Sequence, residues 1–173
     1  MKKFGLIGEK LSHSYSPLIH SKFGDYPFDL CEVSEEELEP LLRREEYGGF
    51  NVTIPYKKTV MKYCDEISDH AKAIGSVNTV VRDSSGRLTG HNTDYYGFSC
   101  LLQTAGIDVR DMKCAVLGSG GASVTVQAVL RDMGAGEIVV ISRSGENNYE
   151  NISRHFDSEI VVNATPVGMY PNN

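Results

Sequence analysis

CAVLGSGGAS, residues 114–123, joins an apolar strand to a helix through a glycine-rich turn. We expect the strand over 113–117, the turn over 118–121 and the helix over 122–133. Backbone amides and the dipole of a helix N-terminus in this position can receive a pyrophosphate. The match to G-x-G-x-x-G is imperfect because Ser123 stands at the third glycine, so a plain tight turn is the alternative interpretation.

The next strand, expected over 137–142, completes a β-α-β unit, and a right-handed crossover makes its two strands parallel. An NAD enzyme usually carries an acidic residue at this strand end to bind the ribose hydroxyls, but this chain has Arg143. A planar guanidinium suits a 2′-phosphate, so NADP is favoured over NAD; an exposed arginine at a strand end is the alternative. The predicted cofactor-binding residues from this unit are Gly118, Ser119, Gly120, Gly121, Ala122, Ser142, Arg143 and Ser144.

A third strand is expected over 159–162, shortly before the sequence stops. Because a complete dinucleotide-binding sheet has about six strands, residues 96–173 predict a linker helix followed by only the first part of a Rossmann-type, doubly wound parallel domain. Residues 1–95 are expected to form a separate α/β domain, since short apolar runs alternate there with amphipathic stretches.

Within residues 1–95, local signals predict the individual elements. Ser34 and Glu37 form a capping box that begins a helix. Gly48-Gly49 is expected to break the chain before the strand that Pro55 ends, and the polar turn at 83–86 predicts a hairpin. The expected strands are 4–7, 28–33, 50–54, 77–82 and 87–90, and the expected helices are 16–23, 34–44 and 65–72.

Composition excludes several classes of partner. Lys and Arg total 17 against 23 Asp and Glu, and the basic residues are spread out, which argues against nucleic acid and anionic membranes. No apolar run approaches the length of a membrane span, and the N-terminus is too polar for a signal peptide. The cysteines lack a C-x-x-C pair, so we expect no metal site and interpret them as reduced core thiols of a cytoplasmic protein: Cys31, Cys64, Cys100 and Cys114.

Four segments of the first domain are rich in small polar side chains at expected strand or hairpin ends. They are residues 12–17, 51–57, 74–79 and 90–94. Hydroxyls, amides, one lysine and one aspartate would suit a polyhydroxylated ligand, because each desolvated ligand hydroxyl needs donors and acceptors. Turn and cap chemistry is the alternative for any single segment. The histidines lack mutual spacing, and we expect surface or loop positions for them: His13, His20, His70, His91 and His155.

Taken in order, the motifs S-x-S-x-S-P, N-V-T-I-P-Y-K, G-S-V-N-T, G-H-N-T-D-x-x-G, G-S-G-G-A-S and N-A-T-P-x-G-M resemble those of the shikimate dehydrogenase family, from Phe4 to Pro171. The resemblance implies an NADP-dependent enzyme that reversibly reduces 3-dehydroshikimate to shikimate in aromatic amino-acid biosynthesis. It also implies that Ser14 and Ser16 hold the substrate carboxylate. The remaining implied roles are ring-hydroxyl binding by Thr53, Asn78 and Asn92, catalysis by Lys57 and Asp94, and cofactor binding by Thr165.

The chemistry is consistent with the implied catalytic pair. A lysine ammonium can stabilise a developing alkoxide and supply its proton, and an aspartate can orient that lysine. For Lys57 the alternative is a solvated lysine beside Lys58, and for Asp94 it is a helix N-cap.

The chain departs from the family pattern in two places. Val124 and Thr125 stand where many members carry a basic residue, and Ser-Arg-Ser replaces Asn-Arg-Thr at 142–144. Family members also continue through the rest of the nucleotide fold, so this chain is expected to be poorly active alone. A quinate/shikimate dehydrogenase using NAD or NADP, and an inactive ligand-binding fragment, are the rival hypotheses; a homodimer is compatible with all three.

Overall fold

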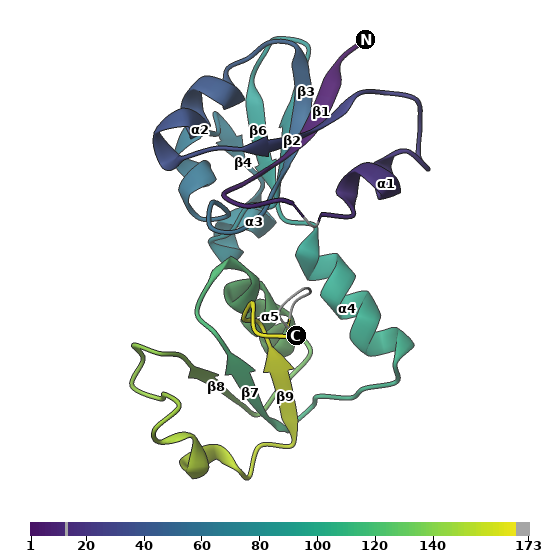
Figure 1. Cartoon of the computed structure of the whole chain (residues 1–173). Coiled ribbons are helices and arrows are strands. Elements are labelled where there is room, and N and C mark those ends of the chain that lie inside the picture. The colour runs from purple at the N-terminus through teal and green to yellow at the C-terminus, as the bar shows by residue number, and fades with distance from the viewer. Residues whose placement is uncertain (13, 169–173) are drawn as a thin grey trace. The chain divides into compact units, whose positions relative to one another are not determined.

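The computed structural model describes residues 1–12 and 14–168, so His13 and Met169 of the family-like motifs lie outside the described residues. Contacts divide the chain into two compact units, Met1–Asn92 and Thr93–Asn173 (Figure 1). The domain boundary predicted from the sequence lies three residues later, after residue 95, within the first turn of helix α4 (Asp94–Thr104).

The first unit is built on a mixed six-stranded sheet with the order β2-β1-β3-β5-β6-β4. The expected hairpin is confirmed, and the Asp83 carboxylate fixes its turn by accepting hydrogen bonds from the amides of Ser85 at 2.8 Å and Arg87 at 3.0 Å. Among the described strands of this sheet, only β5 runs against its neighbours. The strands are β1 (Lys3–Gly8), β2 (Phe28–Glu32), β3 (Tyr47–Val52), β4 (Glu66–Ile67), β5 (Thr79–Arg82) and β6 (Leu88–His91).

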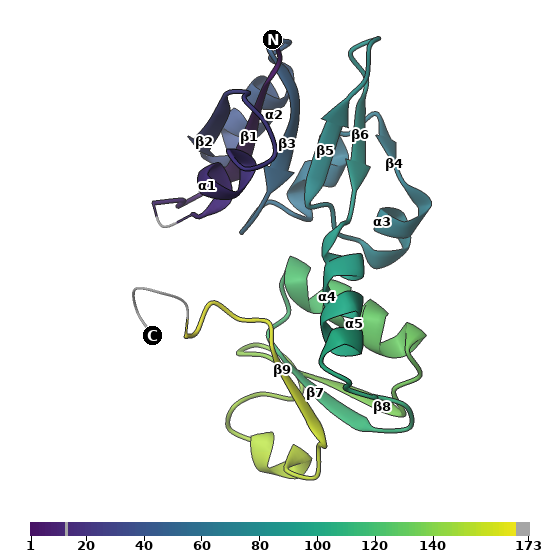
Figure 2. The same ribbon diagram turned by 90° about the vertical axis from the view of Figure 1, so that its right-hand side faces the viewer.

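Side-chain alternation gives this sheet two different faces. One face carries Ile7, Phe50 and Val80, which pack with Leu38 and Leu42 into the main core. Its cover consists of α2 (Glu35–Leu42), the 3₁₀ helix η1 (Thr59–Tyr63) and α3 (Asp69–Ile74), whereas the short helix α1 (Ser16–His20) lies on the opposite face (Figure 2).

Three expectations for this unit are wrong. Gly48-Gly49 lies inside β3, where a Cβ on Gly49 would stand 2.6 Å from the Val80 carbonyl oxygen; the glycine permits close strand approach and makes no break. Residues 65–72 are not one helix, because Glu66–Ile67 pairs with β6 and the Ser68 hydroxyl caps α3 by accepting from the Ala71 amide. Helix α1 ends at His20 and does not reach Phe23.

Other expectations hold or fail in detail. The capping box of α2 is confirmed, with the Ser34 amide donating to the Glu37 carboxylate at 2.8 Å. All four cysteines are free, but Cys100 is exposed and is therefore not a core thiol.

Arg82 links the end of β5 to the end of α2. Its guanidinium donates to the carbonyl oxygens of Leu42, Arg44, Tyr47 and Gly86, the last two at 2.9 and 3.0 Å. The bond to Leu42 satisfies a carbonyl group of the last helical residue, and the other three tie the segment after α2 and the hairpin turn to the same side chain.

We therefore expect Arg82→Met to lower the free energy of unfolding by about 2 kcal/mol, since several charge-assisted bonds disappear together. Arg82→Lys should recover little, because an ammonium cannot reproduce the planar fork. Urea denaturation measures both. The exposed Arg87, whose guanidinium forms an ion pair with Glu66 at 3.7 Å, provides the control Arg87→Met, expected within about 0.5 kcal/mol of wild type. Equal effects at positions 82 and 87 would refute this account.

The second unit confirms the predicted β-α-β unit and its parallel strands. The sheet order is β8-β7-β9, with β7 (Lys113–Leu117), β8 (Glu137–Ile141) and β9 (Ile160–Asn163). Helices α4 and α5 (Gly121–Asp132) pack on one face through a core that includes Leu102, Val116 and Val129, and Ile152 of the 3₁₀ helix η2 (Ile152–His155) packs on the other. This is the doubly wound, Rossmann-type arrangement over the described strands.

Helices α4 and α5 are also joined by a polar contact. The Tyr95 hydroxyl donates to the Asp132 carboxylate at 2.7 Å, and this bond, with burial, raises the pKa of Tyr95 to about 12.

Among the described residues, no helix combines the length and apolar character needed to cross a membrane.

Candidate functional site

The predicted substrate residues of the first unit gather at one edge of its sheet. The register pairs Ile7 with Val52, Asn51 with Thr79, and Thr79 with His91, so the C-terminal ends of β1, β3 and β6 meet the N-terminal end of antiparallel β5. The residues that follow or precede these ends are Ser14, Ser16, Thr53, Lys57, Asn78 and Asn92.

Backbone hydrogen bonds fix the segments that carry these side chains. The Thr53 amide donates to Ile7 at 2.9 Å, and the Val77 amide donates to the carbonyl oxygen of Lys57 at 2.8 Å. The Asn78 amide donates to His91 at 3.0 Å. The side chains of Thr53, Lys57 and Asn78 therefore project from backbone segments that hydrogen bonds to neighbouring segments hold in place.

Asn78 and Asn92 are buried at this edge, with only 7% and 4% of their surface exposed. The Asn92 side-chain amide donates to the Ser76 carbonyl oxygen at 2.9 Å, and the Asn78 side-chain oxygen accepts from the Thr79 hydroxyl at 3.1 Å. Ser76 is completely buried, and its hydroxyl has no hydrogen-bond partner among residues 1–12 and 14–168. The two amides are thus oriented by the protein before any ligand binds.

Ser14 and Ser16 lie on the segment between β1 and α1. The Ser14 amide donates to Leu11 at 2.9 Å, and the Ser14 hydroxyl oxygen accepts from the Ser16 amide at 3.2 Å. Pro17 then occupies the first turn of α1, where its missing N–H does no harm. These hydrogen bonds form a local turn that holds Ser14 and Ser16 close to each other at the start of α1.

His20 corrects the expectation of surface or loop histidines, because its ring is half-buried and bonded on both nitrogens. It contacts the Asn51 side-chain oxygen at 3.0 Å and the Tyr26 hydroxyl at 2.9 Å. The sequence gave little indication that His20 would make these contacts. The available hint was that His20 follows Ser16 by four residues, about one helical turn.

Asp94 is described in the second unit, separately from Lys57 in the first. The alternative that Asp94 caps α4 is wrong, since the N-cap is Thr93 and Asp94 is the first helical residue. Its carboxylate lies in the first turn, where the helix dipole favours a negative charge.

The glycine turn of the second unit meets the ends of all three described parallel strands. Gly118 has a φ of +107°, and a Cβ there would stand 3.0 Å from both the Ala164 carbonyl oxygen and the Thr165 methyl carbon. At Gly120 a Cβ would meet nothing within 4 Å, so the space above this residue is open. The turn therefore requires glycine at position 118 because of its backbone conformation. At Gly120 the backbone conformation does not require glycine, but the open space allows a ligand to approach the backbone.

Ser123, at the third glycine position, is completely buried and accepts a hydrogen bond from the Gln127 amide at 3.1 Å. A serine hence fits the close contact of α5 with the sheet. The Thr125 hydroxyl is buried as well, donating to the Gly121 carbonyl oxygen at 3.1 Å.

Arg143 follows β8 and is exposed, and no described residue forms a hydrogen bond or ion pair with its guanidinium. Ser142 beside it is buried, and its amide donates to Asn147 at 3.0 Å, which closes the loop. Thr165, after β9, donates its hydroxyl to Asn163 at 2.6 Å. A cationic group and a glycine turn thus occupy the same edge of the second sheet.

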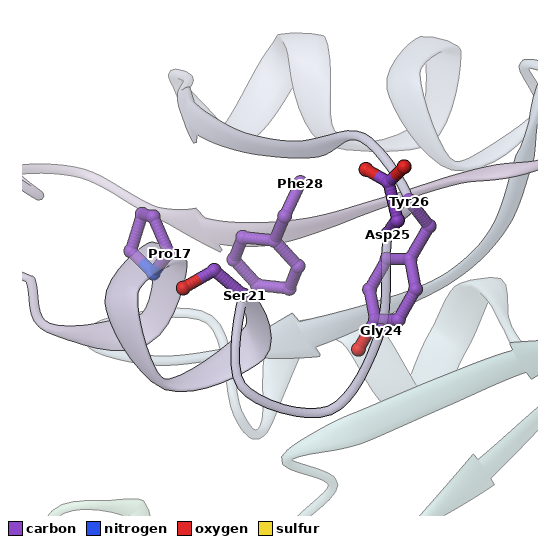
Figure 3. A pocket seen from close by; sticks show the side chains of 6 residues that line it. All are labelled: Pro17, Ser21, Gly24, Asp25, Tyr26 and Phe28. Carbon is purple, nitrogen blue, oxygen red and sulfur yellow. The ribbon is translucent and has the colours of Figure 1, made fainter.

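A pocket of about 270 Å³ lies elsewhere, beside α1 and the loop before β2 (Figure 3). Its lining includes Pro17, Tyr26 and Phe28 but none of the predicted site residues. The candidate site is therefore located at the ends of the strands and not in this pocket.

Comparison with known proteins supports the motif resemblance. A family model described as "Shikimate dehydrogenase substrate binding domain" matches residues 6–80. A Clostridium beijerinckii relative named "Shikimate dehydrogenase (NADP(+))" is 44% identical, over 99% of this chain and 70% of the relative.

Solved structures agree. Shikimate dehydrogenase 1 from Peptoclostridium difficile is 38% identical with a TM-score of 0.92, covering 99% of this chain and 70% of that one. The Thermus thermophilus enzyme, solved with NADP(H) and shikimate, is 31% identical with a TM-score of 0.84, covering 97% and 70%. The chain belongs to the shikimate dehydrogenase family.

Proposed function

We propose that this protein is an NADP-dependent shikimate dehydrogenase, which interconverts 3-dehydroshikimate and shikimate in aromatic amino-acid biosynthesis. The observation that carries the proposal is the gathering of hydroxyl, amide and lysine side chains at one sheet edge, in a chain that matches enzymes of this name over 99% of its length. The chain spans about 70% of the length of the relatives cited above.

In this proposal the polar edge binds the substrate. The hydroxyls of Ser14 and Ser16 donate to the carboxylate, while Thr53, Asn78 and Asn92 bind the ring hydroxyls. Side-chain amides suit that task because each offers both a donor and an acceptor. Their pre-set orientation lowers the ordering cost of binding.

Lys57 and Asp94 are proposed as the catalytic pair. When the ketone is reduced, the Lys57 ammonium stabilises the developing alkoxide and donates its proton to that oxygen; in the reverse direction the amine accepts the hydroxyl proton. Asp94 orients the ammonium. NADP, when bound, supplies the nicotinamide that gives or takes the hydride.

The cofactor-binding residues are proposed on the second unit. The open space at Gly120 admits a pyrophosphate to the N-terminus of α5, and Ser119, Gly121 and Ala122 line the same turn. Arg143, flanked by Ser142 and Ser144, is the proposed ligand of the 2′-phosphate, because its guanidinium is exposed and uncommitted among the described residues. Thr165, which lies next to Gly118, is proposed as a further cofactor-binding residue.

We expect Arg143→Ala to weaken NADP binding by about 10- to 100-fold while changing NAD binding little, since only NADP carries the 2′-phosphate. Fluorescence titration of each reduced cofactor measures the two Kd values. Arg154→Ala is the matched control, because Arg154 is also exposed and belongs to the same unit. An unchanged ratio of NADP to NAD affinity in Arg143→Ala would exclude this residue as the phosphate ligand.

The function itself is tested by shikimate-dependent reduction of NADP, followed by nicotinamide absorbance. Quinate and NAD are run in parallel, and faster turnover with quinate would favour the quinate/shikimate hypothesis. Shikimate binding without any turnover would favour a ligand-binding role. A chimera that continues into the C-terminal part of the Clostridium beijerinckii relative tests the expectation that the chain alone is poorly active.

Two finer proposals accompany this function. A cytoplasmic location is supported by four free thiols, and fractionation of cells tests it. A homodimer is proposed from the resemblance, and sedimentation equilibrium would distinguish it from a monomer.

A further inference from the structure

Helix α1 needs an explanation for its stability. It has only five residues, none of them buried, and its apolar side chains Leu18 and Ile19 are 60% and 52% exposed. Isolated helices shorter than about 12 residues are marginal in water. Neither helix propensity nor burial therefore holds α1, which begins at Ser16, against the sheet.

The His20 ring supplies the missing attachment. It stacks on Phe28 of β2 with ring centroids 3.9 Å apart and an interplanar angle of 21°. Its Nε2 lies 3.0 Å from the Asn51 side-chain oxygen on β3, and its Nδ1 lies 2.9 Å from the Tyr26 hydroxyl. Tyr26 and Phe28 also line the pocket beside α1 (Figure 3). One side chain thus joins α1 to strands β2 and β3 and to the loop before β2.

The hydrogen-bond roles follow from the partners. The Asn51 atom in contact is a side-chain oxygen, which only accepts, so we assign Nε2 as the donor to it and Nδ1 as the acceptor from the Tyr26 hydroxyl. A glutamine can reproduce both roles, with its amide nitrogen donating and its oxygen accepting. Alanine can reproduce neither.

Asn51 is the important partner because Thr53 follows it by two residues on the same chain segment. Ser16 lies one helical turn before His20, and the Ser16 amide is bonded to the Ser14 hydroxyl. The contact between His20 and Asn51 therefore sets the position of the two serines relative to the end of β3.

We infer that His20 is a positioning residue, which fixes Ser14 and Ser16 where they hold the substrate carboxylate while itself making no contact with the substrate. The inference rests on the proposed function, because that function assigns the carboxylate to these serines.

The test is the Kd of shikimate, measured by calorimetry on the full chain. His20→Ala is expected to weaken binding about tenfold, and His20→Gln is expected to restore it to within about threefold of wild type. Lys22→Ala is the matched control, since Lys22 is exposed just beyond α1 and should leave the Kd unchanged. Equal Kd values for wild type and His20→Ala would overturn the inference.

The methyl ester of shikimate separates positioning from general damage. It lacks the carboxylate charge, so His20→Ala should weaken ester binding much less than shikimate binding. Loss of affinity for both compounds in equal proportion would also overturn the inference, because it would mean that the whole edge had been disturbed.

Hydrogen exchange keeps this inference apart from the proposed function. The amides of Ile19 and Ser21 are bonded to Tyr15 and Pro17 at 3.0 Å, and their exchange reports the attachment of α1 without any ligand. Faster exchange in His20→Ala, with recovery in His20→Gln, supports the attachment, and unchanged exchange overturns it. A wild-type chain that fails to bind shikimate at all would contradict the proposed function, and with it the substrate role of His20, whatever the exchange result.

Discussion

Lys57→Met should lower the turnover of shikimate by about a thousandfold, while raising its Kd only a few-fold. Methionine keeps the length and apolar stem of lysine but removes the amine that would accept the hydroxyl proton of shikimate and, once protonated, stabilise the alkoxide-like transition state. The backbone should not move, because the Lys57 carbonyl oxygen accepts from the Val77 amide whatever side chain is present. A large loss of kcat with little change in binding is expected for a group that acts in the transition state.

The neighbouring lysine provides the control. Lys58 is exposed and precedes η1, so Lys58→Met should retain wild-type turnover. Both variants are assayed in this chain and in the longer chimera, so that slow turnover of the chain alone does not hide the difference. If Lys57→Met and Lys58→Met have the same kcat, Lys57 is a solvated lysine after a strand and the proposed mechanism is wrong.

The second unit could be predicted almost completely from local signals. The turn at 118–121 stands between a buried strand and an amphipathic helix, and each of these elements forms within two residues of its expected bounds. The prediction worked because a β-α-β unit is built from neighbouring segments. Its one irregular residue, Ser123, is accommodated by burial against the sheet.

The first unit shows where such signals end. Gly49 is a turn former by type, but its surroundings are the Val80 backbone of a strand more than thirty residues away in sequence. Glu66–Ile67 forms a strand because β6 is present to pair with it. His20 is fixed by partners from β2, β3 and the loop before β2. Non-local contacts of this kind override local propensity and leave no periodic pattern in the sequence.

Gly118→Ala should lower the stability of the second unit, whereas Gly120→Ala should leave it nearly unchanged. At Gly118 an alanine must adopt a φ of +107° with its Cβ 3.0 Å from the Ala164 carbonyl oxygen, so we expect a loss of stability of about 2 kcal/mol even without a cofactor. At Gly120 the φ of −78° and ψ of −171° are allowed for any residue, and the added carbon meets nothing. Gly120→Ala should therefore unfold within about 0.5 kcal/mol of wild type.

The same substitution at Gly120 should nevertheless weaken NADP binding by about a hundredfold, because a methyl group would stand where the backbone must approach the pyrophosphate. Urea denaturation without ligand and cofactor titration of the same preparations give the two numbers. A plain tight turn predicts a different result: Gly120→Ala would bind NADP as tightly as wild type. If Gly120→Ala keeps the stability of wild type without ligand, its loss of affinity is assigned to the contact with the cofactor, an assignment that the destabilised Gly118→Ala could not support.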